Sequence, residues 1–115
     1  MTHDIHARLS HLAISAQKVR LVVDLVRGKE AVQAMEILRF APQGAARPVG
    51  KLLASAVANA EENFGVSRDD LFVAKIFADE APTRKWRRFG ARGRFKPLMR
   101  RSSHVTVILR ERESA

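Results

Sequence analysis

Residues 71–109 read LFVAKIFADEAPTRKWRRFGARGRFKPLMRRSSHVTVIL, and this stretch decides the fold. Its two ends, residues 71–78 and 105–109, are rich in β-branched and aromatic residues and are short for helices, which predicts two strands. Between them lies a long basic segment with Gly90 and Gly93 near its middle. Glycines at that point favour a turn. The stretch therefore predicts two strands of one sheet joined by a long basic hairpin.

The hairpin is expected over about residues 80–104, within a chain that is one domain over residues 1–115. Pro82 and Pro97 each lack a backbone donor, so the two arms cannot be central strands of a sheet. Each arm of roughly ten residues would reach on the order of 30 Å at about 3.3 Å per residue. A two-stranded arm with many like charges and little apolar surface is not stable alone in water. We therefore expect an anionic partner to order it.

Charge is concentrated in residues 84–101, where half of the residues are basic and none is acidic. These are Arg84, Lys85, Arg87, Arg88, Arg92, Arg94, Lys96, Arg100 and Arg101. The whole chain has 21 Lys and Arg against 12 Asp and Glu, so the other 12 basic residues balance every acid. The net charge of +9 thus belongs to this one segment. A neutral body with one concentrated basic element indicates directed binding to a polyanion.

The first helix is expected at residues 16–27. Val19, Val22, Val23 and Val26 repeat at the spacing of one helix face. Ser15 supplies an oxygen for an N-cap, and Gly28 is suited to a left-handed end. The valines have modest helix propensity, so packing of this stripe must hold the helix.

The remaining elements complete an α+β fold. Alternation predicts a strand over residues 5–14. Apolar spacing predicts helices over residues 30–40 and 45–63, the latter beginning as late as Pro48. The order of elements predicts three helices packed on a three-stranded antiparallel sheet, with a long extended basic β-hairpin.

Composition excludes several classes of site. The chain has no cysteine, which removes disulfides and thiolate metal sites. Its histidines (His3, His6, His11 and His104) have no recognisable ligand spacing, and no catalytic group is assembled, so we expect no metal, no cofactor and no enzyme. We find no secretory signal and no apolar run of about 18 residues, so a soluble cytoplasmic protein without a membrane partner is expected.

Aromatic residues in the basic segment favour nucleic acid as the polyanion. Trp86, Phe89 and Phe95 can stack on unpaired bases while arginines hold phosphates. An RNA-binding structural protein is the first hypothesis. A DNA-binding architectural protein with a β-arm in a groove is the second, and an enzyme acting on nucleic acid is the third.

Several motifs resemble one family over residues 6–110, in the same order. Residues 14–22 (ISAQKVRLV), 25–29 (LVRGK), 56–63 (AVANAEEN), 79–82 (DEAP) and 101–107 (RSSHVTV) closely resemble the family of bacterial large-subunit ribosomal protein number twenty-two. This resemblance implies a cytoplasmic structural constituent of the large ribosomal subunit that binds ribosomal RNA, aids its assembly and is a monomer outside the ribosome. It also implies neighbouring ribosomal proteins as partners and a hairpin that lines the exit tunnel beside the nascent polypeptide.

The resemblance and the charge pattern together nominate the site residues. The expected RNA-binding residues are Ser15, Gln17, Lys18, Arg20, Arg84, Lys85, Trp86, Arg87, Arg88, Arg92, Arg94, Lys96, Arg100, Arg101, Ser103 and His104. The expected tunnel-lining tip is Gly90, Ala91, Arg92, Gly93 and Arg94.

Neutralising the tip should leave folding intact. We expect the double variant Arg92→Gln, Arg94→Gln to unfold thermally at the same temperature as the parent chain, because both residues lie far from the apolar positions that form the core. Circular dichroism melts of the two isolated proteins measure this. A large drop in the melting temperature of the variant would contradict the placement of these residues at the tip.

Overall fold

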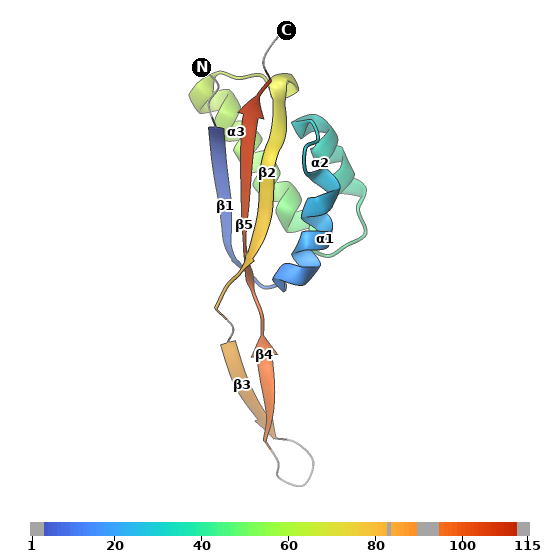
Figure 1. The fold of residues 1–115 in the computed structure, drawn as a ribbon, viewed down its shortest axis with the longest axis vertical. Coiled ribbons are helices and arrows are strands. Elements are labelled where there is room, and N and C mark those ends of the chain that lie inside the picture. The colour runs from blue at the N-terminus through green and yellow to red at the C-terminus, as the bar shows by residue number, and fades with distance from the viewer. Residues whose placement is uncertain (1–3, 83, 90–94, 113–115) are drawn as a thin grey trace.

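A computed structural model describes residues 4–82, 84–89 and 95–112, and for residues 84–89 and 95–100 it describes the backbone alone (Figure 1). The elements in chain order are β1 (Asp4–Leu12), α1 (Ala16–Val26), α2 (Ala31–Phe40), α3 (Ala46–Phe64), a short 3₁₀ turn (Arg68–Asp70), β2 (Leu71–Glu80), β3 (Arg84–Phe89), β4 (Phe95–Arg100) and β5 (Ser103–Glu111). These bounds lie within four residues of every bound predicted from the sequence.

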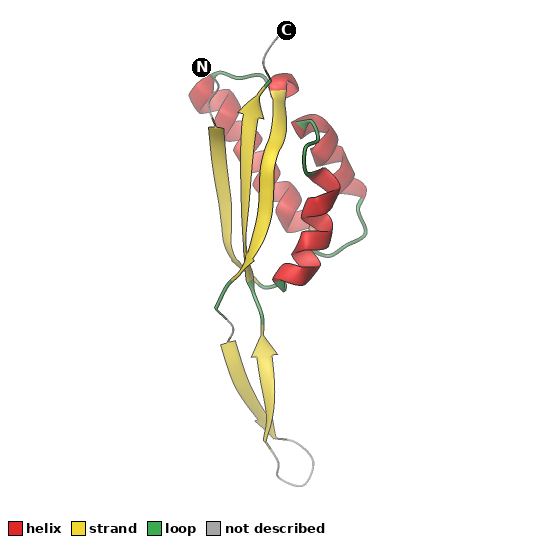
Figure 2. Cartoon of the chain, viewed as in Figure 1, coloured by secondary structure: helices red, strands yellow, loops and turns green. Residues whose placement is uncertain are grey.

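The body has two layers. Strands β1, β5 and β2 form an antiparallel sheet in that order, so β5 is central and pairs on both sides. Figure 2 shows α3 crossing behind this sheet with α1 and α2 beside it. Among the described residues, no helix covers the opposite face of the sheet. The predicted α+β class, with three helices on a three-stranded antiparallel sheet, is confirmed.

The valine stripe of α1 is the centre of the core. Val19, Val22, Val23 and Val26 are all fully buried. They belong to one cluster with residues from α2, α3 and all three strands of the sheet, including the alternate β5 residues from Val105 to Leu109. Packing of this stripe thus holds α1, as the modest helix propensity of valine requires.

Helix α3 begins at Ala46, which places Pro48 in its first turn. A proline costs little there because the first amide groups of a helix have no partner inside the helix. Gly50 follows where α2 is close, since a Cβ placed on it would lie 3.6 Å from Cβ of Leu38. The helix ends at Gly65, whose φ of +65° and N–H bond to the Ala60 carbonyl form a left-handed end.

The free edge of β2 is covered by α1 and the loop after it. Nε of Arg20 donates to the Ala78 carbonyl at 3.2 Å, and a guanidinium nitrogen of Arg27 donates to the Ile76 carbonyl at 2.9 Å. The loop adds a bond from the Gly28 amide to the Val73 carbonyl at 3.1 Å. These contacts satisfy backbone groups that an edge strand otherwise offers to another chain.

Two irregularities interrupt the strand register. β1 pairs regularly with β5 as far as Leu9 and again at Leu12, and between them His11 has a φ of 55°. β1 therefore ends at Leu12 instead of continuing to residue 14 as predicted. In β2 the register shifts between Val73 and Lys75, which is a bulge of one extra residue.

The hairpin strands form a sheet of their own. β3 pairs only with β4, from Arg84 opposite Arg100 to Phe89 opposite Phe95, and this ladder projects beyond the body (Figure 1). The Cα radius of gyration is 17.4 Å, against about 13 Å for a compact domain of this size. The prediction that the arms stand apart from the main sheet is confirmed. The predicted tip, residues 90–94, lies outside the described residues.

The body and hairpin meet at a neck that a serine fastens. The neck is formed by the two segments that enter and leave the hairpin, around Ala81 and Ser102, together with the adjoining loop between β1 and α1. The Ala81 amide donates to the Ser102 carbonyl at 3.0 Å between these two segments. Ser103 is fully buried, and its hydroxyl donates to the Ile14 carbonyl at 2.9 Å. This bond ties the loop between β1 and α1 to the start of β5.

Removing the Ser103 hydroxyl should destabilise the fold. We expect Ser103→Ala to lower the free energy of unfolding by about 1–3 kcal/mol, because the Ile14 carbonyl would lose the side-chain donor it has in the buried neck. Urea unfolding followed by circular dichroism measures this. Ser102→Ala, which changes the neighbouring half-buried residue, is the matched control and should stay near the parent value. Equal stability of the two variants would contradict the role of the bond.

Candidate nucleic-acid interface

The hairpin ladder places like charges opposite one another. Its register sets Arg84 against Arg100 and Arg88 against Lys96. Residues directly opposite in an antiparallel pair are close neighbours, and like charges there are destabilising. An anion between the paired cations removes that repulsion. The ladder is thus suited to binding phosphates along its length.

The other residues nominated in the hairpin divide into two groups. Lys85 and Arg87 lie on β3, and Trp86 lies between them opposite Leu98 of β4. Arg92 and Arg94, with the rest of the expected tip, lie outside the described residues, so their role stays a prediction.

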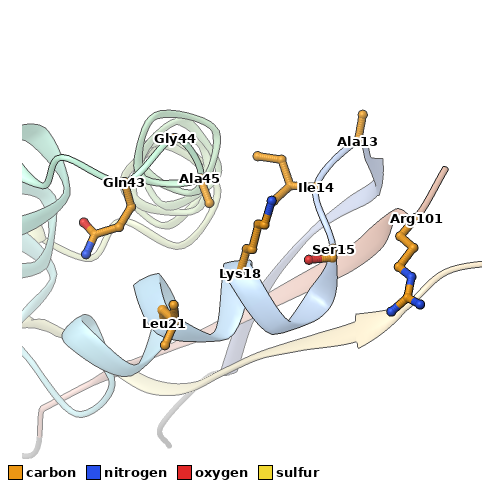
Figure 3. Close-up of a pocket in the computed structure, with 9 residues that line it drawn as sticks. All are labelled: Ala13, Ile14, Ser15, Lys18, Leu21, Gln43, Gly44, Ala45 and Arg101. Atoms are coloured by element: carbon orange, nitrogen blue, oxygen red, sulfur yellow. The ribbon is translucent and has the colours of Figure 1, made fainter. Parts of the chain in front are cut away.

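The neck brings together nominated residues that are far apart in the sequence. A hollow of about 750 Å³ is lined by Ser15, Lys18 and Leu21 of the α1 region, by the loop before α3, and by Arg101. Figure 3 shows the Lys18 side chain extending toward Ile14, with Ser15 between Lys18 and Arg101. A second hollow, about 220 Å³, adds Gln17 next to Arg101. Four of the expected RNA-binding residues therefore meet at the base of the hairpin.

The start of α1 differs from its prediction in one detail. Ser15 is the N-cap residue, but its hydroxyl makes no capping bond. The helix begins through the backbone alone, with the Val19 amide donating to the Ser15 carbonyl at 3.1 Å. The first-turn amides therefore receive no bond from the Ser15 side chain, and amides at a helix start with a cation such as Lys18 beside them are suited to an anion.

Two nominated residues support the fold. Arg20 lies on α1 beyond Lys18, and its Nε is engaged with the Ala78 carbonyl of β2. Ser103 has no exposed surface, so its hydroxyl cannot contact RNA in this structure. Burial therefore corrects the expectation for Ser103, which fastens the neck instead. A serine within an otherwise apolar alternating strand is a signal that could have indicated this.

His104 lies on the open face of the sheet beside His11. Its Nδ1 accepts a hydrogen bond from the His11 amide at 3.1 Å, and the two rings are in edge-to-face contact with centroids 4.6 Å apart. Partial burial, together with the positive charges of Arg8 and His11, lowers the pKa of His104 below its usual value of 6.5. The bond from His11 requires an unprotonated Nδ1, which agrees with this direction.

Two cations that were not nominated from the sequence lie on the open face of the sheet. Arg8 and Lys75 are exposed there, together with Phe77. Residues 71–78 were predicted to be a strand from their β-branched and aromatic content, without an exposed and a buried face, and the bulge between Val73 and Lys75 interrupts the two-residue alternation that would separate these faces. If the alternation is followed separately on each side of Ala74, then Lys75, Phe77 and Asp79 fall on the exposed face of the strand.

Within the described part of the chain, no group of three or more histidine or acidic side chains is placed to hold a metal ion. Likewise, no described helix has the length and apolar character needed to cross a membrane.

Comparison with known proteins gives matches over most of the chain. A family model described as Ribosomal protein L22p/L17e matches residues 7–110. The chain is 49% identical over 100 residues to the Large ribosomal subunit protein uL22 of Pediococcus pentosaceus, covering 87% of this chain and 85% of that protein. It is 48% identical over 103 residues to the Large ribosomal subunit protein uL22 of a Thermoanaerobacter species, covering 90% and 93%.

Acidification should weaken the fold through His104. Its pKa is lower in the folded chain than in the unfolded one, so its contribution to stability is complete above pH 6.5 and is lost as pH falls below that value. We expect the melting temperature to fall from about pH 7 to about pH 5, and His104→Asn, which keeps an acceptor but does not titrate, to reduce that fall. An NMR titration midpoint for His104 above 6.5 would refute this assignment.

Proposed function

The chain belongs to the ribosomal protein L22p/L17e family, and from this premise we propose that it binds large-subunit ribosomal RNA through its hairpin and neck. It is a structural constituent of the large ribosomal subunit and not an enzyme. The finer proposal concerns which surfaces make the contacts. Of the hypotheses raised by the sequence, the DNA-binding protein and the nucleic-acid enzyme are set aside by this membership.

The hairpin register is the observation that carries the proposal. Arg84 opposite Arg100 and Arg88 opposite Lys96 would repel each other in water. Phosphates of RNA neutralise such pairs, and the release of their counterions drives binding. The segment from residue 84 to residue 101 contains no acid that could do this from within the hairpin. The hairpin is therefore suited to polyanionic surroundings.

The neck supplies a second set of contacts. Lys18 and Arg101 border the larger hollow, and the first-turn amides of α1 lie beside Lys18. Gln17 and Ser15 offer hydrogen-bonding groups at the same place. A backbone phosphate of RNA matches these groups, since amide groups at a helix start and nearby cations both favour an anion. We propose that the RNA strand bound along the hairpin continues into this neck.

The tip and the assembly state follow from the resemblance noted in the sequence. We propose that residues 1–115 act as a single RNA-binding domain, monomeric outside the ribosome, with the hairpin spanning about residues 80–104. Its tip, residues 90–94, lines the exit tunnel beside the nascent polypeptide, and the hairpin aids assembly of the surrounding RNA. Trp86 can stack on an unpaired base, as aromatic side chains of RNA-binding proteins do.

Neutralising hairpin cations should weaken binding in a salt-dependent way. We expect the triple variant Arg87→Gln, Arg88→Gln, Lys96→Gln to lower the slope of log affinity against log salt by roughly 0.7–0.9 for each lost phosphate contact. Filter binding to protein-free large-subunit ribosomal RNA, at several salt concentrations, measures the slope.

The matched control neutralises three exposed cations of α2 and α3, Arg39, Arg47 and Lys51, which lie outside the hairpin. Gradient sedimentation from a lysate adds a second measurement, in which the parent chain remains with the large subunit at high salt. Identical salt slopes for the hairpin variant and the parent chain would refute the proposed role of the hairpin.

A further inference from the structure

The face of the main sheet that the helices leave open has a regular composition. Cross-strand pairing aligns Arg8, Thr106 and Phe77 in one row across β1, β5 and β2. The next row is His6, Ile108 and Lys75. Residues that alternate with these positions along the strands, such as Ile5, Val107 and Ile76, are buried under the helices. The open face thus presents an aromatic ring, two cations and hydrogen-bonding side chains on one rigid surface.

Phe77 is a large apolar side chain that is exposed on this face. It is 39% exposed, so a large part of its ring surface is open to solvent. Its neighbour across the strand pair is Thr106, a small side chain that leaves the ring open on that side. An exposed ring on the open face of an antiparallel sheet is the arrangement on which RNA-binding sheets stack unpaired bases.

The backbone on both sides of Phe77 is held in place by α1. Arg27 binds the Ile76 carbonyl at 2.9 Å, and Arg20 binds the Ala78 carbonyl at 3.2 Å. On its other edge β2 is paired with β5 through Phe77 and its neighbours. Phe77 therefore sits on a fixed backbone, which lowers the ordering cost of binding a partner.

Two cations near Phe77 are available to a phosphate. The arginines Arg27, Arg68, Arg110 and Arg112 each have an acidic partner within the chain. Arg8 and Lys75 have no such ion pair among the residues that the structure describes, and both are exposed. Lys75 feels the Asp4 carboxylate only at longer range, since that carboxylate forms its ion pair with Arg110.

The charges also set a direction on this face. Asp79 lies two residues beyond Phe77 on the side of the neck, opposite His104. Its carboxylate disfavours a phosphate at that end. Lys75 lies two residues from Phe77 on the other side, where the nearby Asp4 carboxylate is already paired with Arg110. A nucleotide stacked on the ring therefore has its phosphates favoured on the side of Lys75 and Arg8.

We propose that the open face of the β1–β5–β2 sheet binds an unpaired segment of large-subunit ribosomal RNA, with one base stacked on Phe77 and its phosphates on Lys75 and Arg8. This proposal rests on the proposed function, since it names a further contact with the same RNA. It assigns Arg20 and Arg27 as positioning residues that hold the strand carrying Phe77. A protein segment is the competing occupant, and the experiment separates the two.

Substitution at Phe77 tests stacking directly. Phe77→Leu keeps an apolar side chain but removes the ring, and Phe77→Trp keeps a ring. We expect Phe77→Leu to weaken binding to protein-free large-subunit ribosomal RNA at least roughly fivefold, with an unchanged salt slope because no charge is lost. Phe77→Trp should bind as tightly as the parent chain. Filter binding at one salt concentration, repeated over a salt series, gives both values.

The control and the charge variants complete the design. Phe40 on α2 is 79% exposed, and Phe40→Leu should leave the affinity for RNA unchanged. Arg8→Gln and Lys75→Gln should each lower the salt slope by roughly 0.7–0.9 without changing the effect of Phe77→Leu. Circular dichroism melts of every variant establish that each one is folded under the binding conditions.

The outcomes separate this proposal from the function on which it rests. If Phe77→Leu binds RNA as the parent chain does while the hairpin triple variant loses affinity, the sheet-face proposal is wrong and the proposed function stands. If neither variant loses affinity, both are wrong. Equal losses in Phe77→Leu and Phe77→Trp would overturn stacking, since a packing defect does not require the loss of a ring.

Discussion

The antiparallel pairing of β2 with β5 is the interaction on which the rest of this structure depends. The two strands are joined through the basic hairpin, yet they pair from Leu71 opposite Glu111 to Glu80 opposite Ser103. Their pairing forms the inner face that the valine stripe of α1 covers, and it closes the neck. Because the body is complete without the connection, the hairpin is free to carry charge that a core would not tolerate.

The body and the hairpin differ in whether their cations have acidic partners within the chain. In the body, acids pair with nearby arginines, as in Asp24 with Arg27, Glu61 with Arg68 and Asp4 with Arg110. Exposed pairs of this kind contribute little to stability, but they remove local charge from the surface. Residues 84–101 of the hairpin contain no acid to do the same. The anion that its cations need must therefore come from another molecule, which agrees with a protein that belongs to the ribosome.

Arg20 of α1 illustrates how a residue nominated for RNA binding can instead stabilise the fold. Arg20 was expected to bind RNA because residues 15–20 resemble the RNA-contacting helix start of the family, and the sequence alone cannot distinguish Arg20 from Lys18 there. The structure points Arg20 at the Ala78 carbonyl, while Lys18 borders the hollow at the neck. Ser103 is a similar case, since its hydroxyl was expected at the interface and is used inside the neck.

The sequence by itself determined the helices, the strands, the α+β class and the isolated basic hairpin. Apolar spacing, glycine and proline positions and the distribution of charge are local properties of the chain. Only the tertiary structure decided which cations remain available to a ligand. Arg20 binds a backbone carbonyl at the edge of β2, and the bulge in β2 places Lys75 and Phe77 on the exposed face of that strand. Those outcomes depend on which carbonyl or strand lies opposite each side chain, and that is set by pairing between distant segments.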